Sequence, residues 1–293
     1  MKKYIAFDIG GTMVKYGIID EGGVIIDNDE MQTEARYGGA HILNKIQGII
    51  KKYAKVHTFN GICISTAGMV DSIKGSIIYA NENIPGYTGM KVKEFFESKF
   101  GIPCEIENDV ACAGLAELYS GASKGSKISI CITIGTGIGA CIIIDGKIFH
   151  GATNSAGEIG YMNMLNSKFE NLASVSSLIE KVAGLKQCNS SELNGFKILQ
   201  MAKAGDRICI DAATEMCDIL GYGIANICYV INPEIVVIGG GIAREKDYLY
   251  GLIRKSMDKY LLPELGQKTK LGFAGWGNLA GLLGAYYNFR EKH

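Results

Sequence analysis

The chain has 293 residues, 47% of them hydrophobic, which is enough for two domains of ordinary size with substantial cores. Lysine plus arginine and aspartate plus glutamate number 30 each, and no basic run or basic and aromatic patch suggests a nucleic acid partner. The apolar run after Lys3 ends at Asp8, too early for a signal peptide, and no stretch approaches the ~18 apolar residues that span a bilayer. We therefore expect a cytoplasmic protein that binds a small molecule and contacts no membrane.

The first predicted element is a β-hairpin from Tyr4 to Asp20, whose turn is Gly10-Gly11-Thr12. The same succession of apolar strand, glycine-rich turn and apolar strand recurs without a gap from Ser129 to Asp145, with Gly135-Thr136-Gly137 at the turn. Residues without a Cβ atom let backbone N–H groups approach an anion, so two such turns facing one another would hold a polyphosphate. Asp8, just before the first turn, is placed to hold Mg²⁺ directly or through water. Each turn alone could be ordinary, but the duplication predicts two related lobes with a nucleotide between them.

The remaining elements follow from apolar spacing. Strands that alternate with helices predict a largely parallel sheet with ligands at the carboxyl ends of its strands. Nine cysteines, with no C-x-x-C pair, fall mostly in these apolar segments and are predicted to be reduced core residues. The expected strands are 61–68, 103–109 and 234–242, and the expected helices are 40–55, 92–100, 110–119, 172–183, 196–204, 208–231 and 275–290.

Polar residues Glu107-Asn108-Asp109 lie where a predicted strand ends and a helix begins. Taken alone, Asn108 or Asp109 could be an ordinary helix N-cap. Beside a nucleotide site, however, the Asp109 carboxylate could accept a hydroxyl proton during γ-phosphoryl transfer, and Asn108 could orient the same acceptor. We therefore predict Asp109 as a general base.

Small residues surround Glu158, which has Gly157 before it and Gly160 two positions after it. That setting favours a carboxylate directed at sugar hydroxyls, and an exposed surface glutamate is the alternative. Glu170 carries a weaker signal and could cap the helix expected near Leu172.

Three consecutive glycines, Gly239–Gly241, follow a buried strand and precede a helix. A turn of this kind suits close packing on adenine and ribose. Tight helix packing is the other explanation.

Together these motifs resemble the ROK family of sugar kinases, within the actin, Hsp70 and hexokinase superfamily, over essentially the whole chain. The resemblance implies an α/β chain with the two-lobed actin-like ATPase (ribonuclease H-like) fold and a cleft between the lobes. It places the N-terminal lobe at 1–117 plus 278–293 and the C-terminal lobe at 118–277. It further implies ATP and Mg²⁺ as cofactors, a small-molecule sugar as substrate and a homodimer.

Site residues also follow from the resemblance, motif by motif. Asp109 takes the role of catalytic base, and Asp8 that of the magnesium residue. Segments Ser65–Asp71 and Asn81–Gly86 resemble the sugar-side loops of the family. The residues implied to bind sugar are Gly68, Asn83, Asn108, Asp109, Glu158, Tyr161 and Glu170. Those implied to bind ATP are Asp8, Gly10, Gly11, Thr12, Thr133, Gly135, Thr136, Gly137, Gly240 and Gly241.

Two departures from the family pattern affect the site. Most members carry lysine directly after Gly-Gly-Thr, whereas this chain has Met13 there and Lys15 as the nearest cation, so no phosphate-binding lysine is assigned. The usual zinc site uses a histidine and three cysteines, but Tyr161 occupies the histidine position and 163–169 contains no cysteine. Because all ligands of a tetrahedral site are replaced together, we predict that no zinc binds.

The Gly157–Met162 segment and the closing Ala280–Ala285 segment are similar to the β-glucoside kinases of this family. Those enzymes phosphorylate the 6-hydroxyl of cellobiose-type disaccharides and aryl β-glucosides, and Tyr161 would offer them an aromatic face. A kinase for N-acetylmannosamine, glucose or fructose is the nearest alternative. A transcription repressor would need a DNA-binding domain before the strand at Tyr4, and a catalytically inactive sugar sensor is disfavoured by Asp8 and Asp109.

Overall fold

The computed structural model describes residues 2–80 and 82–293. The chain folds into two compact units, which we call unit 1 (1–119, 151–155 and 278–293) and unit 2 (120–150 and 156–277). The expected lobe boundaries remain a prediction, because compactness does not establish that either unit folds independently. Among the helices of the described residues, none has the length and apolarity required to cross a membrane.

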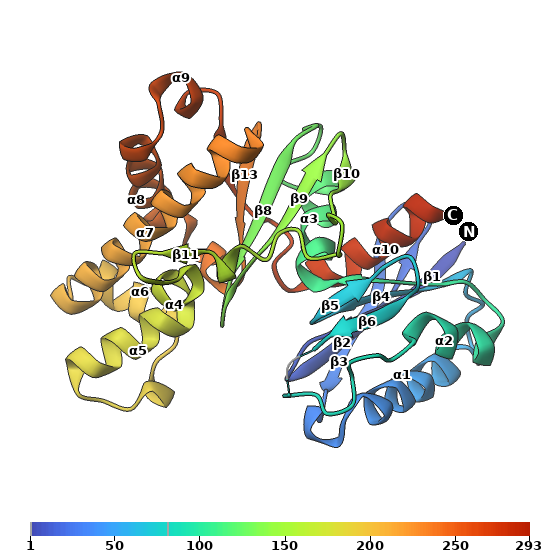
Figure 1. The fold of residues 1–293 in the computed structure, drawn as a ribbon. Coiled ribbons are helices and arrows are strands. Elements are labelled where there is room, and N and C mark those ends of the chain that lie inside the picture. The colour runs from blue at the N-terminus through green and yellow to red at the C-terminus, as the bar shows by residue number, and fades with distance from the viewer. Residues whose placement is uncertain (1, 81) are drawn as a thin grey trace. The chain divides into compact units, whose positions relative to one another are not determined.

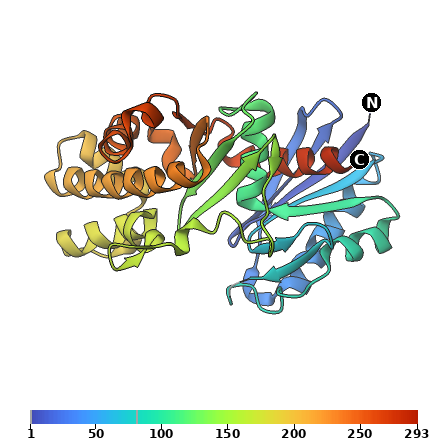
Figure 2. The same cartoon turned by 45° about the horizontal axis from the view of Figure 1, so that its top comes forward.

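The sheet of unit 1 is mixed (Figures 1 and 2). Its first hairpin is antiparallel, and its remaining strands run parallel to the first strand. The strands that alternate with helices, Gly61–Thr66 and Cys104–Asn108, pair parallel as predicted. The three consecutive strands joined by short turns pair antiparallel. In spatial order the strands are β3 (Ile25–Gln32), β2 (Met13–Asp20), β1 (Lys3–Ile9), β4 (Gly61–Thr66) and β7 (Cys104–Asn108).

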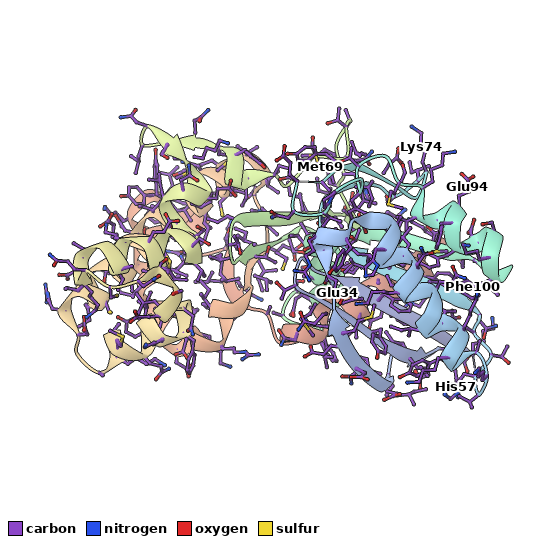
Figure 3. The ribbon with its side chains drawn as sticks, turned by 90° about the horizontal axis from the view of Figure 1, so that it is seen from below. Glu34, His57, Met69, Lys74, Glu94 and Phe100 are labelled. Carbon is purple, nitrogen blue, oxygen red and sulfur yellow. The ribbon has the colours of Figure 1, made fainter. Side chains whose placement is uncertain are left out.

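Helices cover both faces of this sheet. Alternate residues of β1 point to opposite faces: Ile5, Phe7 and Ile9 pack with α1 and α2, whereas Tyr4 contacts rings of α10. Figure 1 shows α10 and α1 on opposite faces, and Figure 3 views the molecule from below, with Glu34 labelled beside α1. The helices are α1 (Gly39–Tyr53), α2 (Val92–Phe100), α3 (Asp109–Ser120) and α10 (Ala280–Lys292), and a small hairpin is formed by β5 (Met69–Asp71) and β6 (Ser76–Tyr79).

Unit 2 repeats the strand order of unit 1. Its strands are β10 (Lys147–Ile148), β9 (Ile138–Ile144), β8 (Ser129–Ile134), β13 (Ile235–Gly239) and β14 (Lys270–Phe273), again with an antiparallel part followed by a parallel part. Residues of α5 to α8 share a hydrophobic core with β8 and β13. The helices are α4 (Phe169–Ala173), α5 (Val175–Lys186), α6 (Gly195–Lys203), α7 (Arg207–Ile231), α8 (Lys246–Tyr260) and α9 (Pro263–Gly266), and β11 (Asn163–Met164) pairs with β12 (Ser167–Lys168).

The duplication is present in the fold, but the two hairpins are not superimposable residue for residue. In the first, Tyr4 pairs with Ile19, whereas the corresponding Ser129 pairs with Ile143, one position earlier than a gapless alignment requires. The second turn is therefore one residue tighter.

The other helices and strands expected from the sequence are present, and their observed bounds differ from the expected ones mainly at the ends. The helix expected at 172–183 is divided in two, because Ser174 leaves the helical conformation and its hydroxyl caps α5 by accepting from the Ser177 N–H at 3.2 Å. The terminal helix begins at Ala280 rather than at 275. Cys188 is half-buried and the other cysteines are buried, as predicted.

Candidate active site

Asp8 lies near the end of β1, between Lys15 of β2 and Ser65 of β4 in the strand register. The Ser65 hydroxyl donates a hydrogen bond of 2.7 Å to Asp8 Oδ1, and Lys15 Nζ is 3.8 Å from Oδ2. Burial raises the pKa of Asp8, and the contacts with Ser65 and Lys15 oppose that shift. Sequence analysis placed Ser65 at the start of an expected sugar-side loop and missed its contact with Asp8, for which the available signal was its position near the end of a buried strand parallel to β1.

The turn after Asp8 is held by backbone and threonine contacts. Gly10 N–H donates to Met13 O at 3.0 Å, and Thr33 Oγ1 donates to Gly10 O at 2.7 Å. Gly11 and Thr12 are exposed, and a Cβ atom at Gly11 would meet nothing within 4 Å. The turn is thus fixed at its base and open at its tip.

Asn108 and Asp109 form the junction between β7 and α3. Asn108 Oδ1 accepts from the N–H groups of Val110 (2.9 Å) and Ala111 (3.1 Å), so Asn108 is the N-cap that the alternative interpretation expected. Its amide nitrogen donates to Gly68 O at 2.9 Å and to Asp109 Oδ1 at 3.1 Å. Val110 N–H also donates to Asp109 Oδ1 at 2.9 Å. These donors orient the half-buried Asp109 carboxylate.

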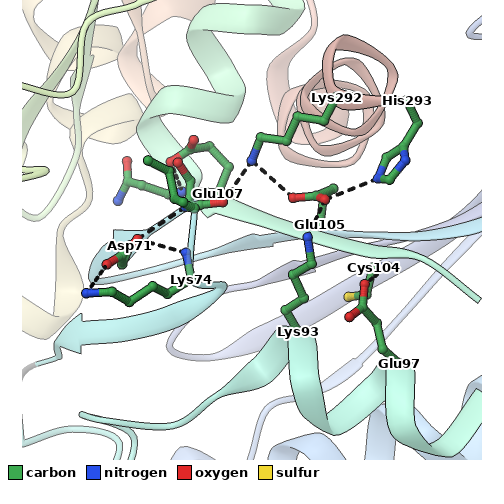
Figure 4. Close-up of polar contacts among 12 residues, drawn as sticks. Asp71, Lys74, Lys93, Glu97, Cys104, Glu105, Glu107, Lys292 and His293 are labelled. Atoms are coloured by element: carbon green, nitrogen blue, oxygen red, sulfur yellow. Dashed lines mark hydrogen bonds and ion pairs between the residues drawn. The ribbon is translucent and has the colours of Figure 1, made fainter.

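The strand that leads to this junction is held by ion pairs near its start. Glu105 is almost fully buried, and its carboxylate contacts Lys93 of α2 at 2.6 Å. Lys292 (3.1 Å) and His293 (3.2 Å), at the end of α10, contact the same carboxylate (Figure 4). Hydrogen bonding and charge from Lys93 and Lys292 outweigh burial and lower the pKa of Glu105.

Of the two segments expected to face the sugar, Ser65–Asp71 contacts Asn108 through Gly68 O. Gly68 has a positive φ of 99°, and a Cβ atom there would lie 2.7 Å from Tyr79 O, so the backbone conformation favours glycine. Tyr87 and Thr66 are buried and their hydroxyl groups are 2.7 Å apart, which ties the β6–α2 loop to the end of β4. Asn83 is exposed in the same loop. Asn81, named in the expected loop 81–86, lies outside the described residues.

In unit 2, Thr133 lies on β8, and the turn Gly135-Thr136-Gly137 connects β8 to β9. Gly135 N–H donates to Gly137 O at 3.0 Å, and Val175 N–H at the start of α5 donates to Gly135 O at 2.9 Å. Thr136 is exposed at the tip. The turn is therefore anchored to a helix N-terminus.

Two carboxylates lie near this turn. A Cβ atom at Gly157 would be 2.0 Å from Ala140 O, and one at Gly160 would be 2.3 Å from Ile138 O, so both glycines allow the Glu158 segment to pack on β9. Glu158 is half-buried rather than a solvated surface residue, and burial, then the charge of Glu170, raises its pKa.

One alternative for Glu170 was that it caps the helix expected near Leu172. Glu170 instead lies inside α4, and Ser174 caps the helix that follows. Its Oε2 atom would be only 2.6 Å from a Cβ atom at Gly137. The structure thus brings Glu158, Glu170 and the second turn together within unit 2.

Tyr161 ends the short 3₁₀ segment Ile159–Tyr161, and 50% of its surface is exposed. Lys168 Nζ lies 4.7 Å from the centre of its ring, which is cation–π distance. Within 2–80 and 82–293, no group of three or more His, Cys, Asp or Glu side chains is suited to a metal ion. The absence of zinc remains a prediction.

The triple glycine connects β13 to the 3₁₀ segment Gly241–Glu245. Gly240 has a φ of 85°, and a Cβ atom there would lie 2.2 Å from Ile134 O at the end of β8. Close packing against a strand, rather than against a helix, therefore explains this glycine. Gly241 has nothing within 4 Å of a Cβ position, so space beside its backbone is open.

Comparisons with known proteins match this chain to one family over nearly its whole length. The model of the ROK family matches residues 4–292. A β-glucoside kinase from Listeria monocytogenes is 30% identical over 298 residues, covering 99% of this chain and 98% of the relative. An uncharacterized protein from Clostridium perfringens is 45% identical over 292 residues, covering 100% of this chain and 99% of the relative.

A solved structure gives the same result for the fold. The ROK family glucokinase of Streptomyces griseus, in complex with glucose and AMPPNP, superimposes with a TM-score of 0.82 at 28% identity, covering 97% of each chain. The expected α/β class with the actin-like ATPase fold is confirmed.

Proposed function

Because the chain belongs to the ROK family, we propose that it is an ATP-dependent sugar kinase that phosphorylates the 6-hydroxyl of β-glucosides such as cellobiose. The observation that carries the chemistry is the junction of β7 and α3, where Asn108 and Val110 N–H hold Asp109 Oδ1. Because an oriented carboxylate can accept a proton, this junction suits a general base.

In the proposed reaction, the sugar 6-oxygen attacks the γ-phosphorus of ATP while its proton moves to the Asp109 carboxylate. The bond from the γ-phosphorus to the β–γ bridging oxygen breaks, and ADP leaves with that electron pair. Asn108 keeps Asp109 in place through its amide nitrogen. A positioned base of this kind contributes a factor of roughly 10²–10⁴ to the rate.

The nucleotide is proposed to contact the two glycine-rich turns and the third glycine segment. Open space at Gly11 and Gly241 supports close approach of a ligand to the backbone. The proposed contact residues are Asp8, Gly10, Gly11, Thr12, Thr133, Gly135, Thr136, Gly137, Gly240 and Gly241.

Asp8 provides a single carboxylate with a hydroxyl neighbour, Ser65. This donor set fits Mg²⁺, which commonly uses one or two protein carboxylates with water and nucleotide phosphates. When bound, the ion would neutralise phosphate charge. Asp8 is proposed to hold it directly or through water.

The sugar is proposed to contact Gly68, Asn83 and Asn108 in unit 1 and Glu158, Tyr161 and Glu170 in unit 2. Glu158 and Glu170 would accept hydrogen bonds from sugar hydroxyls. The exposed Tyr161 ring suits the flat face of a sugar or an aryl aglycone. The Listeria β-glucoside kinase supports this acceptor class.

A kinase for a free hexose or N-acetylmannosamine is the second candidate, and the glucose-bound neighbour from Streptomyces griseus favours glucose within it. A screen with ATP and cellobiose, an aryl β-glucoside, glucose, fructose and N-acetylmannosamine separates the candidates. Preference for β-glucosides supports the proposal, and preference for a free hexose or N-acetylmannosamine refutes the acceptor class. If none of these sugars is phosphorylated, the result would support the catalytically inactive sugar sensor.

We also propose a homodimer, which light scattering of the purified protein tests.

A further inference from the structure

The backbone of α10 passes directly beneath the Asp8 carboxylate, at Gly281. A Cβ atom built on Gly281 would lie 2.3 Å from Asp8 Cγ, 2.5 Å from Oδ1 and 2.6 Å from Oδ2. Non-bonded carbon atoms attract one another best at about 3.5–4.0 Å, so these separations are strongly repulsive. The three nearest atoms all belong to one functional group, the carboxylate.

Asp8 has little freedom to move away. Its backbone pairs with β2 on one side and with β4 on the other, and the Ser65 hydroxyl fixes Oδ1 at 2.7 Å. Only 17% of its side chain is exposed. The carboxylate therefore occupies a slot whose floor is the helix backbone at Gly281.

The helix is equally unable to withdraw. A Cβ atom at Gly284, one turn further along α10, would lie 1.8 Å from Cys112 O, so the backbones of α10 and α3 are in contact. The rings of Tyr286 and Phe289 lie 5.2 Å and 5.3 Å from the ring of Tyr4 on β1. These contacts hold α10 against both α3 and the sheet.

Local backbone requirements do not explain a glycine at this position. Gly281 lies inside α10, and its φ is outside the left-handed region. Alanine adopts the same helical backbone angles without strain. The glycine is therefore explained by the neighbouring side chain.

We propose that Gly281 is a positioning residue for Asp8. Because Gly281 has no side chain, the Asp8 carboxylate can lie against the backbone of α10, in the position from which it would hold Mg²⁺ beside the nucleotide. This inference rests on the proposed nucleotide and Mg²⁺ role of Asp8. Gly281 itself touches neither substrate nor nucleotide in this role. Substitution by alanine should displace the carboxylate while leaving the helix intact.

Four proteins test the proposal: Gly281→Ala, Asp8→Ala, the double variant, and Gly48→Ala as a matched control. Gly48 lies inside α1, is exposed, and has nothing within 4 Å of a Cβ position. Calorimetry measures the affinity for a non-hydrolysable ATP analogue with Mg²⁺ and with a chelator. Turnover of the preferred sugar and thermal unfolding are recorded on the same samples.

We expect Gly281→Ala to reduce the Mg²⁺-dependent gain in nucleotide affinity at least 10-fold. We also expect a lower melting temperature, because neither the carboxylate nor the helix backbone can move freely to make room for the methyl group. Gly48→Ala should bind as the wild type does. The Asp8→Ala substitution makes room for the new methyl group. On that background, Gly281→Ala should change the nucleotide affinity measured with Mg²⁺ by less than 2-fold. This background also keeps the test valid should Gly281→Ala alone fail to fold, since the double variant should then regain its fold.

Normal Mg²⁺-dependent affinity in Gly281→Ala would overturn the proposal, and so would an equal loss on both backgrounds. Calorimetry needs no sugar, so the outcome is independent of the acceptor. A wild-type protein that binds nucleotide with Mg²⁺ but phosphorylates no sugar would refute the kinase function and leave the Asp8–Gly281 coupling standing.

Discussion

Replacing Asp109 with asparagine tests the proposed base with little change in shape. The two hydrogen bonds to Asp109 Oδ1, from Val110 N–H at 2.9 Å and Asn108 Nδ2 at 3.1 Å, can both be accepted by the amide oxygen of asparagine. What disappears is the ability to take up a proton, which is worth roughly 10²–10⁴ in rate, or about 3–5 kcal/mol of barrier. The negative charge at the start of α3 is also lost, at a cost of about 0.3–1 kcal/mol in stability.

These two magnitudes differ enough to be separated experimentally. We expect kcat for sugar phosphorylation to fall by at least about 100-fold, while the melting temperature falls by no more than about 4 °C. The assay couples ADP release to a spectrophotometric reaction, with sugar and ATP varied separately, and KM for both should change little. A variant that retains a tenth or more of wild-type kcat would remove Asp109 from the proton transfer.

Further predictions concern stability, acceptor choice and metal content. Glu105→Gln should destabilise the protein by about 1–3 kcal/mol in urea unfolding, because two lysines lose a charged acceptor. Since the pKa of Glu105 is lowered on folding, its stabilisation is present above the unfolded-state pKa near 4.5 and is lost as pH falls through the lower folded value. The difference between the two proteins should therefore shrink in acid; a constant difference would contradict the ion-pair explanation. Tyr161→His should change the ratio of activities on cellobiose and glucose and leave KM for ATP unchanged, whereas a uniform loss on all sugars would argue against an acceptor role. A zinc chelator, with Mg²⁺ restored, should leave activity and melting temperature unaltered, and inactivation that added zinc reverses would establish a zinc site.

Local patterns were sufficient for features that depend on neighbouring residues. The glycine-rich turns, the polar junction at Asn108 and Asp109, and the glycines around Glu158 all appear in the structure where the sequence suggested. In each case a turn, a cap or a close backbone approach demands particular residue types at fixed spacing.

Features that depend on contacts distant in sequence could not be predicted in the same way. Ser65 reaches Asp8 only through strand pairing, and Gly281 reaches it only through packing of α10 on the sheet. The tighter second turn shifts the pairing of Ser129 by one residue, although the strand patterns align without a gap. Apolar periodicity does not record pairing register when a strand is buried on both faces.

The position of α10 in the chain has a consequence for synthesis. Unit 1 begins with β1, but α10, whose backbone lies against the Asp8 carboxylate, emerges from the ribosome only after all of unit 2 has been made. Until then the face of β1 and β4 that contacts Tyr286 and Phe289 lacks its apolar cover. A nascent chain that stops before Ala280 therefore carries both glycine-rich turns and Asp109, yet has no formed slot for Asp8. Translation must proceed past α10 before the slot that holds the Asp8 carboxylate is complete.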